Sequence, residues 1–392
     1  MKFLHVTDTH LGKTESRIRE RELDFYNSFK QAVDYALEKK VDFVIHSGDL
    51  FDVARPMTRT LIFAVQQLMR LKEANISVYI AAGSHDIGVE DTIISVLEAI
   101  GLLKNLSAAR YYKTQGDKIV MDGEMFRDIF ICGLAGKREN ISDVYEKLQP
   151  ARKGKYNIFI FHHAISDISE KFADITTSLL PKGFDYYAAG HWHGFFETKY
   201  DRGIVVYPGS TDFNDLTEME NHQEKYFCIV DTETKKYEKI RINTRPIVSV
   251  SVNCAGCDAK EVSQKTIMSI PPSGDQAILI IKLNGKLGKG TKSGIDRNII
   301  SESAKSSGYL YTKIYLSELE NPEAPFVSTE RKTVSEIEEE YLKKQKYDDA
   351  SVNVAKQMIT LFGKKLSPAE LKARQKAAVE IVRGFLVDTK TD

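Results

Sequence analysis

The feature that most constrains this chain is a repeated pattern in which a short apolar run ends in glycine, aspartate or histidine. The first three runs are KFLHVTD, VDFVIHSGD and ISVYIAAGSHD. Between them, Arg19 to Lys40 and Thr58 to Ala74 carry apolar residues at helical spacing. Alternating strands and helices predict an α/β domain whose parallel strands end at a common edge.

The pattern of apolar runs changes in later parts of the chain. Five more apolar runs, with fewer helices between them, predict a second sheet: DIFICGL, YNIFIFHH, FDYYAAGHWH, GIVVYPGS and KYFCIVD. We therefore expect a two-sheet sandwich with helices outside over residues 1–244. Residues 245–325 hold strands and Gly- and Lys-rich loops, which predict a small α+β domain. Residues 326–392 contain two capping-box patterns and predict a helical segment.

Composition excludes several classes of protein. The 55 Lys and Arg balance the 55 Asp and Glu, so any surface that attracts nucleic acid must be local. The apolar run at the N-terminus is too short for a signal peptide, and no stretch approaches the ~20 apolar residues of a membrane span. We expect a protein that is not secreted, without a membrane partner, and cytoplasmic and nucleoid-associated if the source is prokaryotic.

Candidate metal ligands stand at the ends of the first three runs. Asp8 and His10 are two residues apart, so in an extended chain they point to the same side and can hold one ion. Asp49 follows Gly48, and one carboxylate can bridge two cations. Ser84 and His85 lie in the turn that ends the third run, and the next residue, Asp86, is expected to cap a helix.

Histidines dominate the ends of the later runs. His162 ends YNIFIFHH, and His191 and His193 repeat the two-residue spacing in a Gly-flanked turn. A single histidine in a core is usually structural, but several at strand ends beside turn residues indicate a site. Carboxylates with imidazoles and no thiolate suit manganese, iron or zinc. Two such ions can promote in-line displacement at a phosphorus atom, which is the reaction we infer.

The ordered motifs resemble the calcineurin-like metallophosphoesterase superfamily over about the first 215 residues. HVTDTHLG, HSGDLFD, GHWH and VYPGS are more narrowly similar to SbcD-like DNA double-strand-break repair nucleases. The resemblance implies two Mn²⁺ ions, with Mg²⁺, Fe or Zn as alternatives. It assigns Asp8, His10 and His193 to one ion and His162 and His191 to the other. Asp49 would bridge them, and His85 would assist the leaving oxygen.

The same resemblance implies substrate and partners. It predicts exonuclease action from 3′ ends and endonuclease action on single strands and hairpins, a DNA-binding cap domain over residues 245–325, and a homodimer. The helices of residues 326–392 would bind an SMC-like coiled-coil ATPase. A flexible basic loop within the cap domain is expected to contact phosphates, with a plain solvated hairpin as the alternative. Its candidate contacts are Lys282, Lys286, Lys289 and Lys292.

Two positions depart from the family pattern. Ser84 stands where the family has an asparagine whose amide oxygen binds the second ion, and Asp52 stands where many members have histidine. A serine hydroxyl is a weaker and shorter ligand, so we expect a weakened second site and reduced nuclease activity. Ser84 leaves one rival function open, a catalytically impaired DNA-binding scaffold of the same complex. Because the metal motifs are shared by the whole superfamily, a protein or nucleotide phosphoesterase is a second rival.

Overall fold

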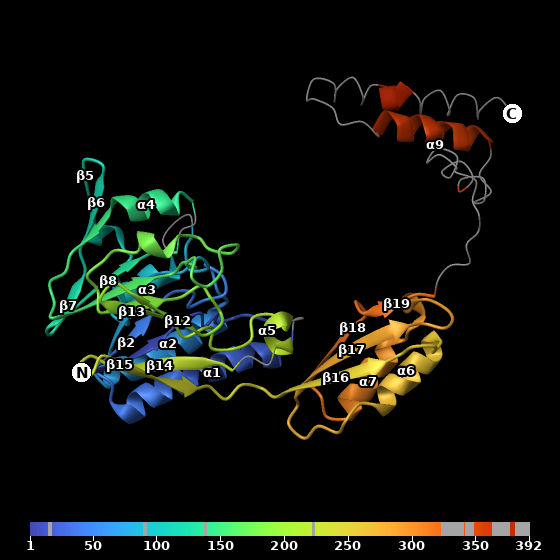
Figure 1. The fold of residues 1–392 in the computed structure, drawn as a ribbon, viewed down its shortest axis with the longest axis horizontal. Helices are drawn as coiled ribbons and strands as arrows, with labels where there is room; N and C mark the ends of the chain where they lie inside the picture. The colour runs from blue at the N-terminus through green and yellow to red at the C-terminus, as the bar shows by residue number, and fades with distance from the viewer. Residues whose placement is uncertain are drawn as a thin grey trace. The chain divides into compact units, whose positions relative to one another are not determined.

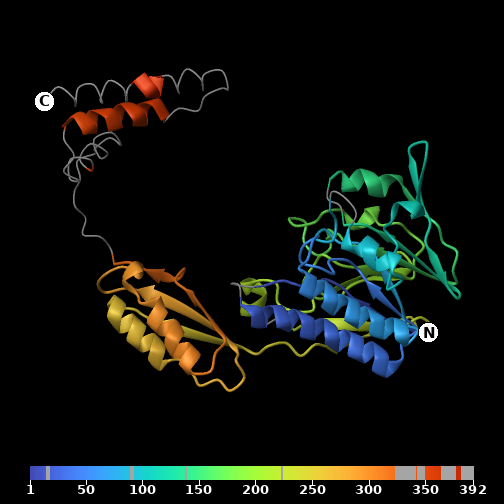
Figure 2. The ribbon, with the colours of Figure 1, turned by 180° about the vertical axis from the view of Figure 1, so that it is seen from behind.

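A computed structural model describes residues 1–14, 18–88, 92–136, 139–221, 224–322, 341, 349–362 and 377–380. The chain divides into two compact units, Met1–Asn321 and Pro322–Asp392. The first unit contains two six-stranded sheets and two smaller sheets (Figures 1 and 2). None of the helices in the described ranges is long and apolar enough to cross a membrane.

The first large sheet carries helices on its outer face. Its strand order is β15-β14-β1-β2-β3-β4, and the neighbours from β1 to β4 are parallel. The strands are β1 (Lys2–Val6), β2 (Phe43–His46), β3 (Ser77–Ile80), β4 (Lys104–Asn105), β14 (Tyr226–Asp231) and β15 (Lys236–Arg241). The helices between them are α1 (Arg19–Lys39), α2 (Thr58–Glu73) and α3 (Ile93–Ala99). The helices expected from apolar spacing are confirmed to within one residue at each end.

The second large sheet has the order β12-β13-β11-β10-β8-β7. Its strands are β7 (Glu124–Phe126), β8 (Ile129–Leu134), β10 (Tyr156–Phe161), β11 (Tyr186–Ala189), β12 (Phe196–Tyr200) and β13 (Gly203–Tyr207). The expectation that KYFCIVD belongs to this sheet is wrong. That segment forms β14, which pairs antiparallel with β1, because the chain crosses back to close the free edge of the first sheet.

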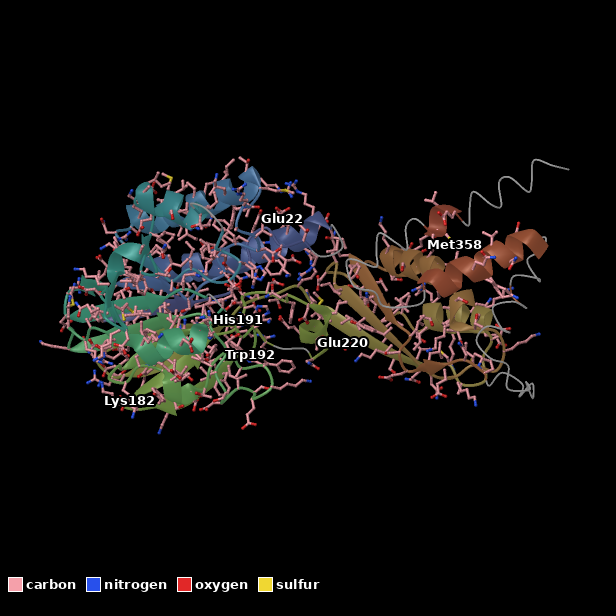
Figure 3. All side chains as sticks on the ribbon, turned by 90° about the horizontal axis from the view of Figure 1, so that it is seen from above. Glu22, Lys182, His191, Trp192, Glu220 and Met358 are labelled. Carbon is pink, nitrogen blue, oxygen red and sulfur yellow. The ribbon has the colours of Figure 1, made fainter. Side chains whose placement is uncertain are left out.

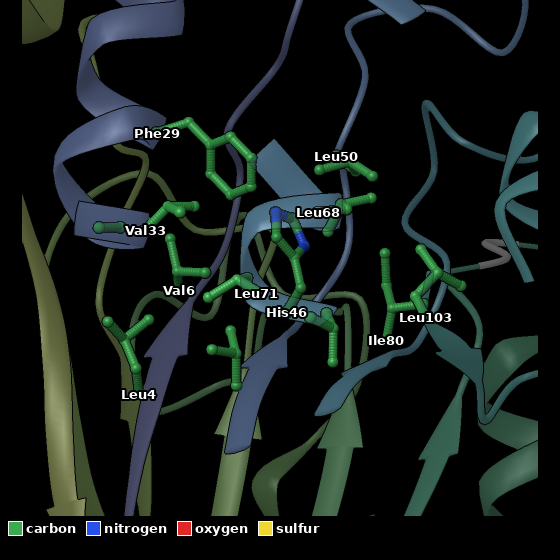
Figure 4. Close-up of a pocket in the computed structure, with 13 residues that line it drawn as sticks. Leu4, Val6, Phe29, Val33, His46, Leu50, Leu68, Leu71, Ile80 and Leu103 are labelled. Carbon is green, nitrogen blue, oxygen red and sulfur yellow. The ribbon is translucent and has the colours of Figure 1, made fainter. Parts of the chain in front are cut away.

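Three apolar layers hold the sandwich together. Alternation along β1 sends Phe3 into the layer between the sheets, while Leu4 and Val6 face α1 and α2. Figure 4 shows the helix-facing layer, which leaves a void of only about 10 Å³. The third layer covers the outer face of the second sheet. The two sheets are therefore fixed against each other by close packing, and the loops at their strand ends rest on a rigid base.

Shorter elements surround this sandwich. A small sheet has the order β5-β6-β9, and short helices follow several strands. These elements are η1 (Ala109–Tyr111), β5 (Tyr112–Gln115), β6 (Lys118–Met121), α4 (Ile141–Lys147), β9 (Leu148–Pro150), η2 (Thr177–Leu179) and α5 (Leu216–Glu220). Asp215 is the N-cap residue of α5, and its side chain accepts a hydrogen bond from the Glu218 amide.

Residues 246–320 form a separate α+β module with its own apolar core. Its strands are β16 (Ile247–Asn253), β17 (Ile278–Lys286), β18 (Tyr311–Tyr315) and β19 (Leu319–Glu320), and its helical segments are α6 (Ala259–Met268), η3 (Lys292–Gly294) and α7 (Arg297–Ser306). All pairings in this sheet are parallel. Phe213 and Met219, which precede this module in the chain, share a buried cluster with Ile278 and Ile280 of β17.

The second unit is described over a small part of its length. α9 (Asp349–Phe362) is its longest described helix. The two expected capping boxes, at Ser335 to Glu338 and Ser367 to Glu370, lie outside the described residues. The helical character of residues 326–392 as a whole therefore stays a prediction, which α9 supports over its own length.

Candidate metal centre

The loops after five strands of the two large sheets converge on one place. β1 leads to Asp8 and His10, β2 to Asp49, and β3 to the turn with His85, while β10 and β11 supply the remaining histidines. The loops are joined by backbone hydrogen bonds, such as the Asp8 amide to the Gly48 carbonyl at 3.0 Å and the His10 amide to the Asp49 carbonyl at 3.0 Å. Parallel strands thus bring residues that are far apart in sequence to a common edge.

Four of these residues have a left-handed backbone. The φ angles are 51° for Asp8, 40° for His10, 53° for Asp49 and 85° for His191. Positive φ is uncommon outside glycine, and a bulky side chain there is held against a local cost of order 1–3 kcal/mol. Their concentration in a single edge indicates that the loops are shaped to aim these side chains, at some expense of stability.

Three glycines at the strand ends allow the loops to approach one another. A Cβ added to Gly48 would lie 2.4 Å from Nδ1 of His162, and one added to Gly83 would lie 2.2 Å from Oδ1 of Asp49. A Cβ on Gly190 would lie 2.3 Å from Oγ1 of Thr7 and 2.4 Å from the Ser47 carbonyl. Any side chain at these positions would displace the predicted ligands, which explains the Gly-Asp and Gly-His sequence patterns.

The first group of predicted ligands is Asp8, His10 and His193. Their donor atoms all lie within 4.8 Å of one another. Nε2 of His10 is 3.2 Å from Nε2 of His193, and Oδ1 of Asp8 is 3.8 Å from the same His193 nitrogen. Asp8 is completely buried, and it accepts hydrogen bonds from the Thr7 hydroxyl and from the His191 amide. The carboxylate is therefore fixed in its orientation by the backbone of the second sheet's loop.

The second group is Asp49, His162 and His191, again within 4.8 Å. Nε2 of His162 lies 3.1 Å from Oδ2 of Asp49. The other ring nitrogen, Nδ1, donates to the Ser47 carbonyl at 2.7 Å, which directs Nε2 toward the carboxylate. Oδ2 of Asp49 is also 3.9 Å from Nε2 of His10, so this one oxygen lies between the two groups.

The geometry fits bound cations. Nε2 of His162 is buried without a hydrogen-bond partner among the described residues. The 3.1 Å contact of His162 with Asp49 is close enough for an ion pair but does not have hydrogen-bond geometry. Two imidazoles on one ion with bonds of about 2.0–2.1 Å would place their nitrogens about 3.0–3.4 Å apart. The 3.2 Å between His10 and His193 matches that spacing.

Charge and burial set the protonation of the metal-free site. Burial lowers the pKa of His10 despite the nearby carboxylates of Asp52, Asp49 and Asp8. For His162 burial acts in the same direction, but the charges of Asp49 and Asp8 outweigh it and raise its pKa to about 9. Burial raises the pKa of Asp49, but His162 and His10 outweigh it, so the net pKa lies well below its usual value. The site is poised to hold positive charge between two buried carboxylates.

The turn after β3 presents the remaining predicted residues. His85 is exposed, and its Nδ1 lies 2.6 Å from the Asp52 carbonyl, while its amide donates to Oδ1 of Asp49 at 2.8 Å. Its ring meets the His10 ring edge-on with centroids 4.9 Å apart. Ser84 is half-buried in the same turn. The amide of His85 thus contacts Asp49 of the second group, while its ring lies beside His10 of the first group and can form a further candidate ligand set with His10 and Asp52. The roles of His85 and Ser84 stay predictions.

Asp86 does not cap a helix. Its carboxylate accepts hydrogen bonds from the amides of Leu50, Phe51 and Gly83, and so ties the loop after β2 to the turn after β3. Burial, together with the charge of Asp49, raises its pKa to about 6. The expectation was wrong because the chain makes a turn here and no helix begins.

The sequence did not predict the buried ion pair that contacts His193 on the side away from the ligand group. Nδ1 of His193 lies 2.8 Å from Oε1 of Glu218 on α5. Oε2 of Glu218 accepts from Nζ of Lys225 at 2.6 Å, and both side chains are buried. Burial opposes ionisation of Glu218, but His193 and Lys225 lower its pKa to about 2. In the sequence, Glu218 and Lys225 stand 25 and 32 residues beyond the histidine among other charged residues, so no pattern distinguishes them from surface charges.

Asp52, the second departure noted in the sequence, lies beside His10. Its carboxylate lies 3.6 Å from Nδ1 of His10 and 3.3 Å from Nζ of Lys13. Burial raises its pKa, while the contacts with His10 and Lys13 lower it, and the net shift is downward. Asp52 therefore places an ionised carboxylate at the open side of His10.

The predicted DNA-contacting lysines lie in the module of residues 246–320, on β17 and in the segment that follows it. Lys282 on β17 pairs with Glu220 at 3.5 Å, and the amino group of Lys292 in η3 donates to the Leu316 carbonyl at 3.0 Å. Lys286 ends β17, and Lys289 bridges to Asp258 through the backbone. DNA contact by these four residues stays a prediction.

Fold and site together define a metal-binding phosphoesterase. In agreement, the profile of the calcineurin-like phosphoesterases matches residues 1–195. The chain is 34% identical over 268 residues to the DNA double-strand break repair protein Mre11 of Methanocaldococcus jannaschii, covering 64% of this chain and 69% of that protein. It is 33% identical to the protein of the same name from Sulfurisphaera tokodaii, covering 64% and 65%. The chain therefore belongs to the Mre11 family.

The similarity extends beyond the phosphoesterase module in a more distant relative. Mre11 of Thermoplasma acidophilum is 25% identical over 366 residues, which is 90% of this chain and 92% of that protein. The module of residues 246–320 and part of the second unit are thus included in an alignment along nearly the whole length.

Proposed function

We propose that this chain is a DNA nuclease that uses two Mn²⁺ ions to cleave phosphodiester bonds. The observation that carries this proposal is the position of Oδ2 of Asp49, 3.1 Å from an imidazole nitrogen of one ligand group and 3.9 Å from one of the other. One carboxylate oxygen between two His-rich groups is what a bridged pair of cations needs. The family's metal dependence agrees with this donor set, and manganese is the ion we propose.

The residues would divide the work as follows. Asp8, His10 and His193 would hold one ion, His162 and His191 the other, and Asp49 both. Such ions supply an activated water and stabilise charge on the attacking and leaving oxygens. His85 is exposed at the mouth of the site, and donation from its Nδ1 to the Asp52 carbonyl leaves Nε2 to face the substrate. When its ring is protonated on both nitrogens, His85 would give the Nε2 proton to the leaving oxygen and keep the Nδ1 proton on the Asp52 carbonyl.

DNA is the substrate we propose because the relatives are named DNA double-strand break repair proteins. We infer exonuclease action from 3′ ends and endonuclease action on single strands and hairpins. The lysines of β17 and its following loop would contact phosphates without reading sequence. We also propose a homodimer, and an SMC-like coiled-coil ATPase as the partner of residues 326–392.

Ser84 favours one second candidate, a scaffold subunit with an impaired site. A serine side chain is shorter than asparagine and offers a hydroxyl in place of an amide oxygen, so a water would have to complete the second ion's shell. Under this alternative the chain would bind DNA and its ATPase partner but cleave slowly.

One experiment separates these functions. Purified protein is incubated with a hairpin, a 3′-labelled duplex and a nucleotide phosphoester, each with Mn²⁺, Mg²⁺ or chelator. The nuclease proposal predicts Mn²⁺-dependent cleavage of both DNAs, abolished in Asp49→Asn and retained in the surface control Asp34→Asn. Binding of the hairpin without cleavage would favour the scaffold. Cleavage of the phosphoester alone would contradict both.

A further inference from the structure

A cleft of about 540 Å³ opens directly beside the candidate metal centre. Two of its walls are the predicted ligands His191 and His193, and between them in sequence lies Trp192. The opposite walls come from the loop after β10, with Phe172, and from the segment around α5. Figure 3 labels His191 and Trp192 beside each other on the loop that follows β11. The cleft is therefore continuous with the place where the scissile phosphate would be held.

Two aromatic side chains in the lining of this cleft are more exposed to solvent than aromatic residues usually are. Phe172 is 63% exposed, although an aromatic ring is normally buried in a core. Trp192 is half-buried and packs against the core on the outer face of the second sheet, which holds it in place. Lys171 places its amino group 5.2 Å from the centre of the Phe172 ring. Such surfaces are what a planar, apolar ligand face requires.

The charges around the cleft favour a nucleobase over a phosphate as its occupant. Asp174, Asp215 and Glu218 belong to its lining, and none of the described lining residues is lysine or arginine. The described lining thus offers no lysine or arginine to bind a phosphate, whereas a neutral base needs none. Amide and hydroxyl groups of Asn221 and Thr217 are also in the lining and can hydrogen-bond to base edges.

We propose that this cleft receives one unpaired nucleobase of the cleaved strand, next to the phosphate at the metal centre, and that the base stacks on Trp192, across the cleft from Phe172. The proposal rests on the proposed nuclease function and deepens it. A base can enter only after it has left the helical stack, which costs a few kcal/mol in a duplex and least in a single strand or hairpin loop. The cleft thus gives the chain a preference for nucleotides that are already unstacked.

Trp192 is the one tryptophan of the 392-residue sequence, so tryptophan fluorescence reports on the cleft directly. Metal-free protein is titrated with an oligothymidylate and with a backbone of equal length made of abasic nucleotides, while anisotropy of a label on each strand measures binding. Stacking predicts that fluorescence falls at saturation with oligothymidylate and stays constant with the abasic strand. Equal quenching by both, or none by a bound oligothymidylate, would overturn the proposal.

Cleavage supplies an independent readout. Trp192→Ala is expected to slow cleavage of a hairpin with a normal loop roughly 10- to 100-fold, in line with the worth of one stacked base. It should hardly change cleavage of a hairpin whose loop is abasic. Trp192→Phe, which keeps an aromatic face, should restore most of the rate, and Met268→Ala, at an exposed position on α6, is the matched control.

The outcomes separate the two levels of the proposal. An equal loss of rate on both hairpins would show that Trp192 acts through folding or ion binding, and would contradict the base subsite while leaving the nuclease function intact. Failure of the unaltered protein to bind or cleave any DNA would contradict the nuclease function, and the base subsite with it.

Discussion

The two groups of predicted metal ligands differ in what stands behind them. In the group of Asp8, His10 and His193, ionised carboxylates contact the far side of the imidazoles: Glu218 behind His193 at 2.8 Å and Asp52 near His10 at 3.6 Å. In the group of Asp49, His162 and His191, the partner of His162 is the neutral Ser47 carbonyl, and the carboxylate of Asp174 approaches His191 only to 3.5 Å, short of the 2.8 Å contact between Glu218 and His193. The ordered turn beside this second group carries Ser84.

Because different groups contact the imidazoles of the two ligand groups, the two ion positions are not equivalent. A carboxylate behind a metal-binding imidazole fixes the ring and makes the nitrogen a stronger donor. The buried Lys225 pairs with Glu218 at 2.6 Å and fixes the carboxylate that contacts His193. We therefore expect the first position to bind its ion more tightly, and the second to depend on conditions and on residue 84.

Removing the shared carboxylate of Asp49 should impair both ion positions at once. Asp49→Asn leaves both groups without the bridging charge, and since two ions supply several kcal/mol of transition-state stabilisation, we expect activity to fall on the order of 10³-fold or more. Isothermal titration with Mn²⁺ should show loss of the weaker ion and weakening of the other. Two ions bound with unchanged affinity would contradict the bridge. Asp34→Asn, on the exposed face of α1, is the control.

Breaking the support of the first group should reverse the order of the two sites. Glu218→Gln keeps the shape of the side chain but removes its charge, and a change of this kind is expected to weaken ion binding at His193 about 10- to 100-fold. It also leaves Lys225 buried without its counter-charge, at a cost of about 3–5 kcal/mol in the free energy of unfolding.

A paired variant separates these two effects. In Glu218→Gln combined with Lys225→Met the buried charge is gone, so the denaturation midpoint should recover. The affinity for Mn²⁺ should stay low, because the imidazole still lacks its carboxylate. If both recover together, Glu218 serves packing alone.

The two groups should respond to pH in opposite directions in the metal-free protein. The pKa of Glu218 is lowered from 4.5 to about 2, so its contribution to stability is present above pH 4.5 and is lost as pH falls toward 2. The pKa of His162 is raised from 6.5 to about 9, so its contribution is present below pH 6.5 and is lost as pH rises toward 9.

Denaturant unfolding at pH 3.5, 6 and 9 measures these contributions, with changes on the order of 1–3 kcal/mol expected for each group. Glu218→Gln should flatten the acid side of the stability curve and His162→Gln the alkaline side. Parallel curves for both variants and the unaltered protein would contradict the assignment of either pKa.

The smallest effect should come from strengthening the second group. Ser84→Asn places an amide oxygen where the hydroxyl stands, and we expect up to about tenfold faster Mn²⁺-dependent cleavage at limiting metal. The gain should vanish at saturating Mn²⁺, because only affinity changes. Ser84→Ala controls for the loss of the hydroxyl. Equal rates for Ser84→Asn and the unaltered chain at limiting metal would show that residue 84 does not bear on the ion.

Local sequence patterns foretold the parts of the fold that depend on neighbouring residues. Apolar spacing gave α1 and α2, and Gly-Asp or Gly-His endings located the loops that carry the candidate ligands. The placement of β14 was missed because strand pairing depends on partners elsewhere in the chain, here β1 at the other end of the module. Asp86 was misjudged for the same reason, since its partners Leu50 and Phe51 follow a different strand.

The sequence by itself determined which chemical groups this protein can bring to a site: two carboxylates, several imidazoles, and the glycines that let their loops approach. Only the tertiary structure decided how those groups are shared, with Oδ2 of Asp49 between two sets, Glu218 and Lys225 behind His193, and Trp192 and Phe172 facing a cleft. The physical reason is that side-chain identity and local backbone preference act over a few residues, whereas contact between residues 8, 49, 162 and 193 exists only after both sheets have closed on their shared core.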